Sequence, residues 1–294
     1  MFTAADPHAI QIAGKTWIYA TGGGGPAEFF AWSSGDLKDW EKTGPVFRLA
    51  DAGWVPDDGA PRHFAWAPCV VEEKGRVFFY YSVGPQNPTP SRIGVAVGQG
   101  PQGPFKDSGK PLLTGDETFE AIDPFVFKDP ATSTHYLYAG GSAGARLRVF
   151  QLGADLVSIE REVPVETPRM FTEGAFVHVH GGIYHLSYSH GSYRNDSYSV
   201  HCSTSPGPLG PWTYRGPILS SDSRHKGPGH HSIIQDPKGE GAWMVYHRWN
   251  DRQGPGPYQG QRATCMDRLI HRPDGTIQPV IMTDEGAEKA ASAK

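Results

Sequence analysis

Residues 6–22 read DPHAIQIAGKTWIYATG, and the pattern of this stretch indicates the fold. Two runs in which apolar and polar residues alternate, at 9–12 and 16–20, are joined by a turn that contains Gly14. That pattern is typical of a β-hairpin. Two further strand-like runs follow, FFAWSS at 29–34 and WEKTGPVF at 40–47. The opening of the chain therefore predicts one unit of four antiparallel strands.

The same unit recurs four more times. The later copies start about 50 to 60 residues apart, with WAPCVVEEKGRVFFYYSV from Trp66, DPFVFKDPATSTHYLYAGG from Asp123, EGAFVHVHGGIYHLSYSHG from Glu173 and HHSIIQDPKGEGAWMVYHRW from His230. Five such units predict an all-β protein, a five-bladed β-propeller that forms a single domain. We expect the propeller to span residues 1–283 and a polar, frayed C-terminal tail to occupy 284–294.

A pair of β-sandwiches with accidental internal similarity is the alternative fold. Three of the units, however, end in the same way, with an aromatic residue near a Pro-Leu or Pro-Val strand, at Trp40, Phe105 and Trp212. This regularity favours the propeller.

Composition and charge exclude several classes of function. The 294 residues carry a formal net charge of −4 and no basic run, so no nucleic-acid partner is expected. No window reaches the roughly 18 uninterrupted apolar residues that cross a bilayer, so we expect no membrane segment. Cys69, Cys202 and Cys265 lie far apart without CxxC spacing, which favours free thiols. The stretch before Asp6 is too short for a secretory leader, which predicts a cytoplasmic protein or a leader already removed.

The first residue of each unit is a candidate functional residue. In a propeller the first strand of each blade lies innermost, so residues at its start converge on one end of the central channel. Three carboxyl groups in a narrow cleft cannot all ionise freely, which generates separate acid and base roles. Such a pair can hydrolyse a glycoside. The five positions are Asp6, Trp66, Asp123, Glu173 and His230.

Two further considerations bear on these positions. Carboxyl groups on blades across a channel tend to leave room for a water molecule, which favours an inverting over a retaining hydrolase. The alternative is that the residues only form turns, because Asp-Pro, present at Asp6 and Asp123, is a common turn opener.

At these positions the chain resembles glycoside hydrolase family 43. The resemblance covers almost the whole chain and rests on ADPHAIQIAGKTWIYAT, WAPCVV, AIDPFVFKD, TEGAFVHVHGGIYHLSYS and GPGHHSII, one motif per blade. It implies a five-bladed propeller with Asp6 as general base, Glu173 as general acid, and Asp123 as the residue that orients the acid and adjusts its pKa. The fourth motif reads Glu-Gly-Ala where Glu-Gly-Pro is the commoner family form, so the local loop shape is expected to differ.

The resemblance also implies residues that bind the substrate or a metal. Trp66 would line the sugar site, and Arg262 in GQRATC would bind sugar hydroxyls, with Arg248 in YHRW as its rival. His230 would lie near the axis, where it contacts the sugar or a hydrated calcium ion. His231 points to the opposite face of its strand. Calcium prefers six to eight oxygen ligands, so one imidazole implies an ion held mostly by water.

Histidines are also concentrated at 178–190. His178, His180, His185 and His190 suggest a metal cluster by number, and His178 and His180 share a strand face. They flank the Gly181-Gly182 turn and lack a cysteine partner and an HExxH motif. We therefore interpret them as ordinary strand histidines.

These residues, together with the resemblance, predict an inverting exo-glycosidase that releases a terminal pentose, β-D-xylose, α-L-arabinofuranose or both, from hemicellulose-derived oligosaccharides. An endo-acting α-1,5-L-arabinanase is the nearest alternative. It needs a long open groove, whereas insertions at 54–64 and 193–197 are expected to close one side of the site. A non-catalytic carbohydrate-binding propeller is the alternative of another class, but three acids on separate blades exceed what binding a neutral sugar requires. The sequence indicates no oligomeric state.

Overall fold

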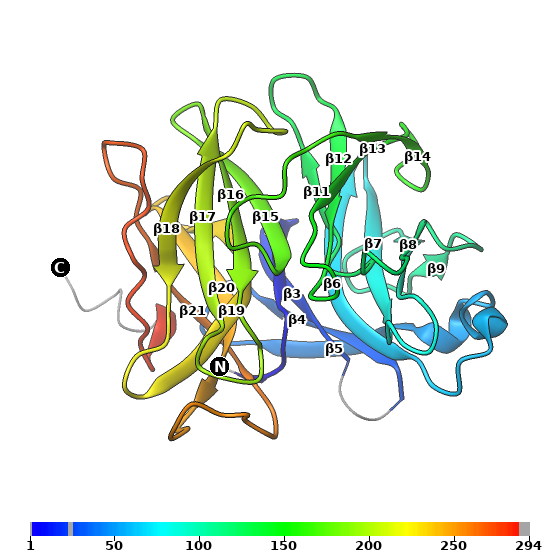
Figure 1. Ribbon diagram of the computed structural model, residues 1–294, viewed down its shortest axis with the longest axis horizontal. Coiled ribbons are helices and arrows are strands. Elements are labelled where there is room, and N and C mark those ends of the chain that lie inside the picture. The colour runs from blue at the N-terminus through cyan, green and yellow to red at the C-terminus, as the bar shows by residue number, and fades with distance from the viewer. Residues whose placement is uncertain (1, 23–25, 288–294) are drawn as a thin grey trace.

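The computed structural model describes residues 2–22 and 26–287. It is almost entirely β-structure and consists of five antiparallel sheets arranged around a central axis (Figure 1). The first strand of each sheet contacts the first strands of its two neighbours, so these five strands close a ring. The prediction of an all-β, five-bladed propeller is confirmed.

The strands follow one another in chain order from the axis outward. Blade 1 contains β2 (His8–Ile12), β3 (Lys15–Ala20), β4 (Glu28–Ser34) and β5 (Glu41–Arg48). Blade 2 contains β6 (Phe64–Glu73), β7 (Arg76–Gly84) and β8 (Arg92–Gly98), and both β9 (Lys106–Asp107) and β10 (Leu113–Thr114) pair with β8. Two short 3₁₀ turns, η1 (Leu49–Asp51) and η2 (Val55–Asp58), connect these two blades.

The remaining blades repeat this order. Blade 3 contains β11 (Phe125–Lys128), β12 (His135–Ala139), β13 (Arg148–Leu152) and β14 (Ile159–Val163). Blade 4 contains β15 (Glu173–His180), β16 (Ile183–His190), β17 (Ser199–Ser205) and β18 (Thr213–Leu219). Blade 5 contains β19 (His225–Gln235), β20 (Ala242–Asn250) and β21 (Ala263–Leu269), with β1 (Phe2–Thr3) at its edge.

The outer strand of blade 5 departs from the predicted pattern of four strands from each unit. It is β1, from the N-terminus, and it pairs antiparallel with β21 through Phe2 opposite Thr264. The Phe2 ring stacks on Trp32 of blade 1, with ring centroids 4.3 Å apart. The N-terminus thus joins the first and last blades and closes the ring.

The tight hairpins at the centre of the fold have a local cause. In three blades the inner strand and the next are joined by only two residues, and both have positive φ. Type I′ turns require that conformation, and glycine adopts it without steric cost. Each of these loops accordingly has glycine at its second position: Ala13–Gly14, Lys74–Gly75 and Gly181–Gly182.

Apolar side chains fill the spaces between neighbouring blades. One cluster combines residues of blades 2, 3 and 4, among them Tyr80, Leu137 and Leu186, and another combines blades 1 and 2. The three cysteines are buried and form no disulfide, as predicted. Among the described residues no helix is long and apolar enough to span a bilayer.

The segment after β21 packs against the propeller. Ile277 and Met282 are buried in the cluster that joins blades 4 and 5. Asp284 accepts a hydrogen bond of 2.9 Å from the fully buried Arg248 and faces His225 at the same distance. The tail predicted to begin at Asp284 is therefore anchored at its first residue, because the Asp284 carboxylate neutralises the buried guanidinium of Arg248. The part of that prediction that falls on 288–294 lies outside the described residues.

Candidate active site

The starts of the five inner strands meet at one end of the channel, as the sequence predicted. A pocket of about 300 Å³ lies there. All six predicted site residues line it, together with five that were not singled out: Asp6, Trp66, Asp123, Glu173, His230 and Arg262, with Thr21, Glu120, Ile122, Ser142 and Tyr193.

One residue with positive φ positions these side chains in each blade: Asp6 and Asp123 lie two residues before the inner strand, and Ala67, Gly174 and His230 lie within it. The five φ angles are +53° at Asp6, +29° at Ala67, +55° at Asp123, +64° at Gly174 and +42° at His230. Trp66 and Glu173 therefore each precede the left-handed residue of their blade rather than occupy it. Positive φ is costly for residues other than glycine and persists where the surroundings hold it.

Side chains of the preceding blade hold four of these backbones. The Ala67 amide donates to the hydroxyl of Thr21, which follows β3, at 2.8 Å. The Asp123 amide donates to the hydroxyl of Ser82 on β7 at 2.9 Å, and the His230 amide donates to Ser189 on β16 at 2.8 Å. The Asp6 amide lies 3.1 Å from Nδ1 of His247 on β20 and donates to it. The packing of neighbouring blades thus fixes the positions of the functional residues.

Asp6 is held in its ionised form. Arg262 donates to its Oδ1 at 3.0 Å, and the Thr21 hydroxyl donates to Oδ2. Burial by itself would raise the pKa of Asp6, but the Arg262 guanidinium and the nearby His247 hold that pKa well below the usual 3.8. Asp6 is consequently a carboxylate at neutral pH and can accept a proton.

Glu173 has the opposite character. Its carboxyl is buried, and burial together with the negative charge of Asp123 raises the pKa of Glu173 to about 8. The buried Tyr198 hydroxyl donates to Glu173 Oε1 at 2.6 Å, and this contact acts in the other direction, toward a lower pKa. Glu173 therefore retains its proton at neutral pH and can donate it.

Asp123 and His230 lie near both carboxyl groups. Nδ1 of His230 is 3.4 Å from Asp123 and 3.8 Å from Asp6. Burial alone would lower the pKa of His230, but the carboxylates of Asp123 and Asp6 raise it to about 9. His230 thus places a positive charge among the carboxylates. His231 faces the other side of the strand, as predicted, and its Nε2 contacts the Ser187 hydroxyl at 2.6 Å.

Aromatic side chains form part of the pocket wall. The Trp66 indole stacks on Phe64, with centroids 5.7 Å apart. It occupies the space above Gly84, where an added Cβ would come within 2.2 Å of the indole ring. On another side, the Arg262 guanidinium lies over the Tyr193 ring at 5.0 Å.

Arg262, and not its rival Arg248, belongs to the site. Arg248 is fully buried, binds Asn250 and Asp284, and does not line the pocket. Arg262 lines the pocket and binds the carboxylate of Asp6.

Sequence reasoning missed several residues that shape the chemistry. Glu120, two residues before the Ile-Asp-Pro motif, is a further buried carboxyl in the pocket, and burial raises its pKa. It accepts a hydrogen bond from the Ala143 amide at 2.7 Å. Tyr198 and His247 act on Glu173 and Asp6 from the second strands and loops of their blades. Neither Tyr198 nor His247 begins a unit, so only an alignment of the five repeated units with one another could have indicated these two residues.

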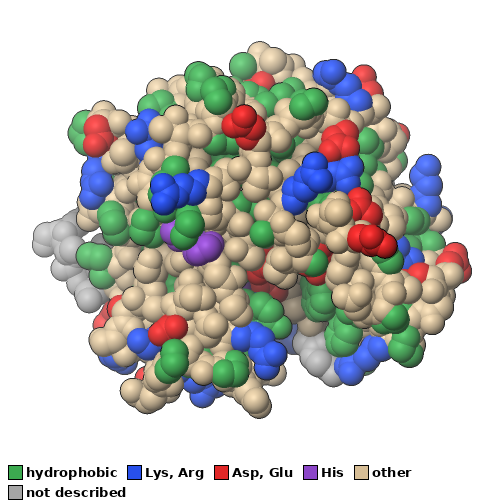
Figure 2. Space-filling view, in the orientation of Figure 1, with side chains coloured by type: hydrophobic (Ala, Val, Ile, Leu, Met, Phe, Trp, Pro, Cys, Tyr) green, Lys and Arg blue, Asp and Glu red, His purple; other side chains and the backbone are tan. Residues whose placement is uncertain are grey.

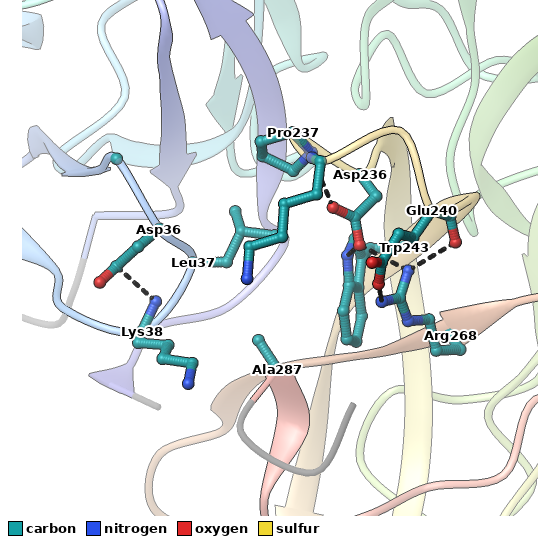
Figure 3. Close-up of a pocket in the computed structure, with 11 residues that line it drawn as sticks. Asp36, Leu37, Lys38, Asp236, Pro237, Glu240, Trp243, Arg268 and Ala287 are labelled. Atoms are coloured by element: carbon teal, nitrogen blue, oxygen red, sulfur yellow. Dashed lines mark hydrogen bonds and ion pairs between the residues drawn. The ribbon is translucent and has the colours of Figure 1, made fainter. Parts of the chain in front are cut away.

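A second cavity, of about 340 Å³, lies between blades 1 and 5 (Figure 3). Its acidic residues already have partners: Asp236 binds Trp243 and Arg268, and Asp36 binds the hydroxyl of Ser34 and backbone amides. No acid–base pair of the kind formed by Asp6 and Glu173 is present among its lining residues. On the face drawn in Figure 2, acidic and basic side chains are interspersed, without a large patch of one sign.

The arrangement supplies what the hydrolysis of an acetal requires. One carboxyl is protonated and one is ionised at the same pH, and both face a pocket that also contains an indole face and a guanidinium. A sequence model described as Glycosyl hydrolases family 43 matches residues 2–277. The chain belongs to this family.

Individual family members resemble the chain over most of its length. A protein named Beta-D-galactofuranosidase xynD from Aspergillus niger is 33% identical over 97% of this chain and 84% of its own. An arabinoxylan arabinofuranohydrolase from Bacillus subtilis is 28% identical over 98% of this chain, which spans 64% of that protein. A family-43 β-xylosidase/α-arabinofuranosidase from a compost metagenome, crystallised with xylotriose in a calcium-free form, is 26% identical, with a TM-score of 0.76 and coverage of 95% and 96%. The chain is thus a glycoside hydrolase, which acts on oligosaccharides.

Proposed function

We propose that this family-43 hydrolase is an inverting exo-glycosidase that releases terminal β-D-xylose or α-L-arabinofuranose from hemicellulose-derived oligosaccharides. The observation that carries the proposal is the opposite protonation of two pocket carboxyls. Asp6 on blade 1 is ionised beside Arg262, whereas the pKa of Glu173 on blade 4 is raised to about 8.

The two groups divide the reaction between them. Glu173 donates its proton to the glycosidic oxygen as the bond to the anomeric carbon breaks. Asp6 accepts a proton from a water molecule, whose oxygen attacks that carbon from the opposite face. The products are a sugar of inverted anomeric configuration and an alcohol. Asp123 keeps Glu173 protonated through its charge, and Arg262 keeps Asp6 ionised. Asp6 and Glu173 lie on non-adjacent blades. This placement supports inversion, because a water molecule has to fit between the base and the substrate.

The walls of the pocket support exo action on a small sugar. The pocket of about 300 Å³ is bounded by Trp66 on one blade and by Tyr193 in the loop that follows β16. That loop is held in place, since the Trp249 indole donates to the Tyr193 carbonyl at 2.8 Å. Glu120 and Arg262 can bind sugar hydroxyls from two sides. Walls formed by Trp66 and Tyr193 favour a terminal sugar over an internal one, which an endo-arabinanase would have to bind.

A galactofuranoside is the second candidate substrate. The relative named for galactofuranosidase activity is 33% identical over nearly the whole chain. A furanose with a longer exocyclic arm presents its ring and anomeric carbon much as arabinofuranose does, so the same acid and base could act on it.

The first test is a comparison of three nitrophenyl glycosides, the β-D-xylopyranoside, the α-L-arabinofuranoside and the β-D-galactofuranoside, with wild type and Asp6→Asn. We expect release of nitrophenol from one of the two pentosides and loss of at least about 100-fold in kcat in the variant. Activity confined to the galactofuranoside would refute the pentose assignment. Activity on linear arabinan alone would refute exo action. Binding of sugars without any turnover would indicate the carbohydrate-binding alternative.

We also propose that a hydrated calcium ion can lie near His230. Calcium prefers oxygen ligands, and the protonated ring of His230 faces Asp123, so this histidine would contact the ion only through the ion's water shell. No catalytic step depends on it here. Treatment with a chelator should lower the melting temperature, and addition of calcium should restore it. An unchanged melting temperature and turnover after both treatments would contradict the proposal.

A further inference from the structure

Three histidines meet on a part of the fold that the hydrolytic reaction does not use. His178 on β15 lies directly opposite His185 on β16 in the hairpin register, and these strands lie side by side in Figure 1. His271 follows β21 and approaches from blade 5. One ring nitrogen from each residue lies within 4.8 Å of the other two. The interpretation of His178 and His185 as ordinary strand histidines overlooked His271, which is distant in sequence.

The ring nitrogens of the three histidines lie close together. Nε2 of His178 and Nε2 of His271 lie 2.8 Å apart. His185 is fully buried, its Nδ1 lies 3.9 Å from the sulfur of Cys202, and its Nε2 has no hydrogen-bond partner among the described residues. A buried nitrogen without a partner is costly and calls for an explanation. An ion at the centre of the cluster would satisfy it.

The ring nitrogens would have to move by up to about 1.5 Å to hold a metal, because their separations reach 4.8 Å. Nitrogen ligands of a tetrahedral zinc ion lie about 2.0–2.1 Å from the metal, and therefore roughly 3.3 Å from one another. His178 and His271 would have to separate by a few tenths of an ångström. His271 lies outside the named strands and pairs with Ile277 through an isolated bridge.

The geometry points to a site for a divalent late transition metal, zinc in the first instance, formed by His178, His185 and His271. Three imidazoles suit zinc, nickel or copper, and they do not suit calcium or magnesium, which prefer oxygen. The fourth ligand would be water or His180, whose ring stacks on His271 with centroids 3.8 Å apart. A cavity of about 390 Å³ lined by His180 and His271 provides the entry path.

This site is separate from the hydrolytic pocket. His178 is five residues along β15 from Glu173, which corresponds to ~16 Å of extended strand. The ion would connect the β15–β16 hairpin of blade 4 to the segment that follows β21. Its role would therefore be structural, and the hydrolysis of glycosides should not require it.

The test is titration of the chelator-treated, dialysed protein with zinc chloride, followed by calorimetry and by melting temperature. We expect about one zinc ion per chain and a higher melting temperature. His271→Ala should weaken zinc affinity by about 100-fold or more. The matched control is His135→Ala, a half-buried strand histidine on blade 3 that should bind zinc as wild type does. Asp123→Asn should also retain zinc binding, because it alters only the axial pocket.

Several outcomes would overturn the proposal: no zinc binding in wild type, equal binding in His271→Ala, or loss of binding in Asp123→Asn but not in His271→Ala. If His271→Ala does not fold, the wild-type protein provides a second measurement. Modification of histidines by diethyl pyrocarbonate, followed by peptide mass analysis, should show zinc protecting His271 but not His63. Equal modification of His271 with and without zinc would refute the site.

Discussion

Burial raises the pKa of Glu173, and Tyr198 acts to lower it, because the Tyr198 hydroxyl donates a hydrogen bond that favours the carboxylate. Tyr198→Phe removes that bond and retains the ring that stacks on His247. We therefore expect the basic limb of the pH dependence of kcat/KM, which reflects the Glu173 pKa of about 8, to move to higher pH. Tyr246→Phe is the control, since its hydroxyl binds Asp267 outside the pocket. An unchanged or lower basic limb would show that Glu173 is not the titrating acid.

The raised pKa of Glu173 also makes stability depend on pH. The folded protein holds a proton up to about pH 8, whereas the unfolded chain loses it near the usual value of 4.5. The wild-type protein should therefore lose stability as pH rises from 4.5 to 8. Glu173→Gln cannot lose a proton, so its melting temperature should exceed that of wild type by a margin that grows across this window. Glu117→Gln, at an exposed position, should show no such trend. A constant margin would contradict the shift.

The sequence was sufficient to identify the residues that begin the blades, because their motifs carry both the fold and the chemistry. Asp6, Asp123 and Glu173 all line the pocket. The lowered pKa of Asp6 depends on Arg262 and His247, which the unit pattern does not mark. Tyr198, which acts against the raised pKa of Glu173, is not marked by it either. His247 contacts Asp6 from the neighbouring blade 5, and Tyr198 contacts Glu173 from the loop between β16 and β17 of the same blade. No local sequence pattern encodes either contact.

The pairing of β6 with β7 leaves room for the Trp66 indole. Gly84 on β7 lies under the ring, and a Cβ there would approach three of its atoms to within 2.2–2.5 Å. Gly84→Ala should displace the indole from the pocket wall and raise KM about tenfold, corresponding to roughly 1.4 kcal/mol of binding, with a smaller effect on kcat. Gly53→Ala is the control, because nothing lies within 4 Å of the added Cβ. Unchanged KM in Gly84→Ala would exclude Trp66 as a sugar contact.

Hairpins were predictable from local sequence, and contacts between distant elements were not. The Ala13–Gly14 loop has the alternating flanks and the glycine that a two-residue turn requires. The contact of His271 with the β15–β16 hairpin joins positions about 90 residues apart. Nothing in the spacing of His178 and His185 indicates that third partner.

At the scale of the whole molecule, the ring is closed by two residues of β1. Phe2 stacks on Trp32 and meets Trp40 edge-on, at 5.9 Å between centroids. Because Phe2 is only half-buried, Phe2→Ala should lower the free energy of unfolding by about 2 kcal/mol, less than a fully buried phenylalanine would. Turnover at low temperature should be unchanged. Ile281→Ala, at an exposed position, should leave stability unchanged in the same denaturant titration. Equal stability of Phe2→Ala and wild type would show that closure does not depend on this contact.

Glu173 is assigned as the general acid and Asp6 as the general base. The dependence of the turnover rate on the leaving group tests this assignment. Glu173→Ala should be compared with wild type on two glycosides of the same sugar, one with an acidic nitrophenol leaving group and one with a second sugar. The nitrophenol departs without protonation, so its turnover should fall little, whereas turnover of the disaccharide should fall by about 100-fold or more. An equal loss on both substrates would contradict the role of Glu173 as the general acid.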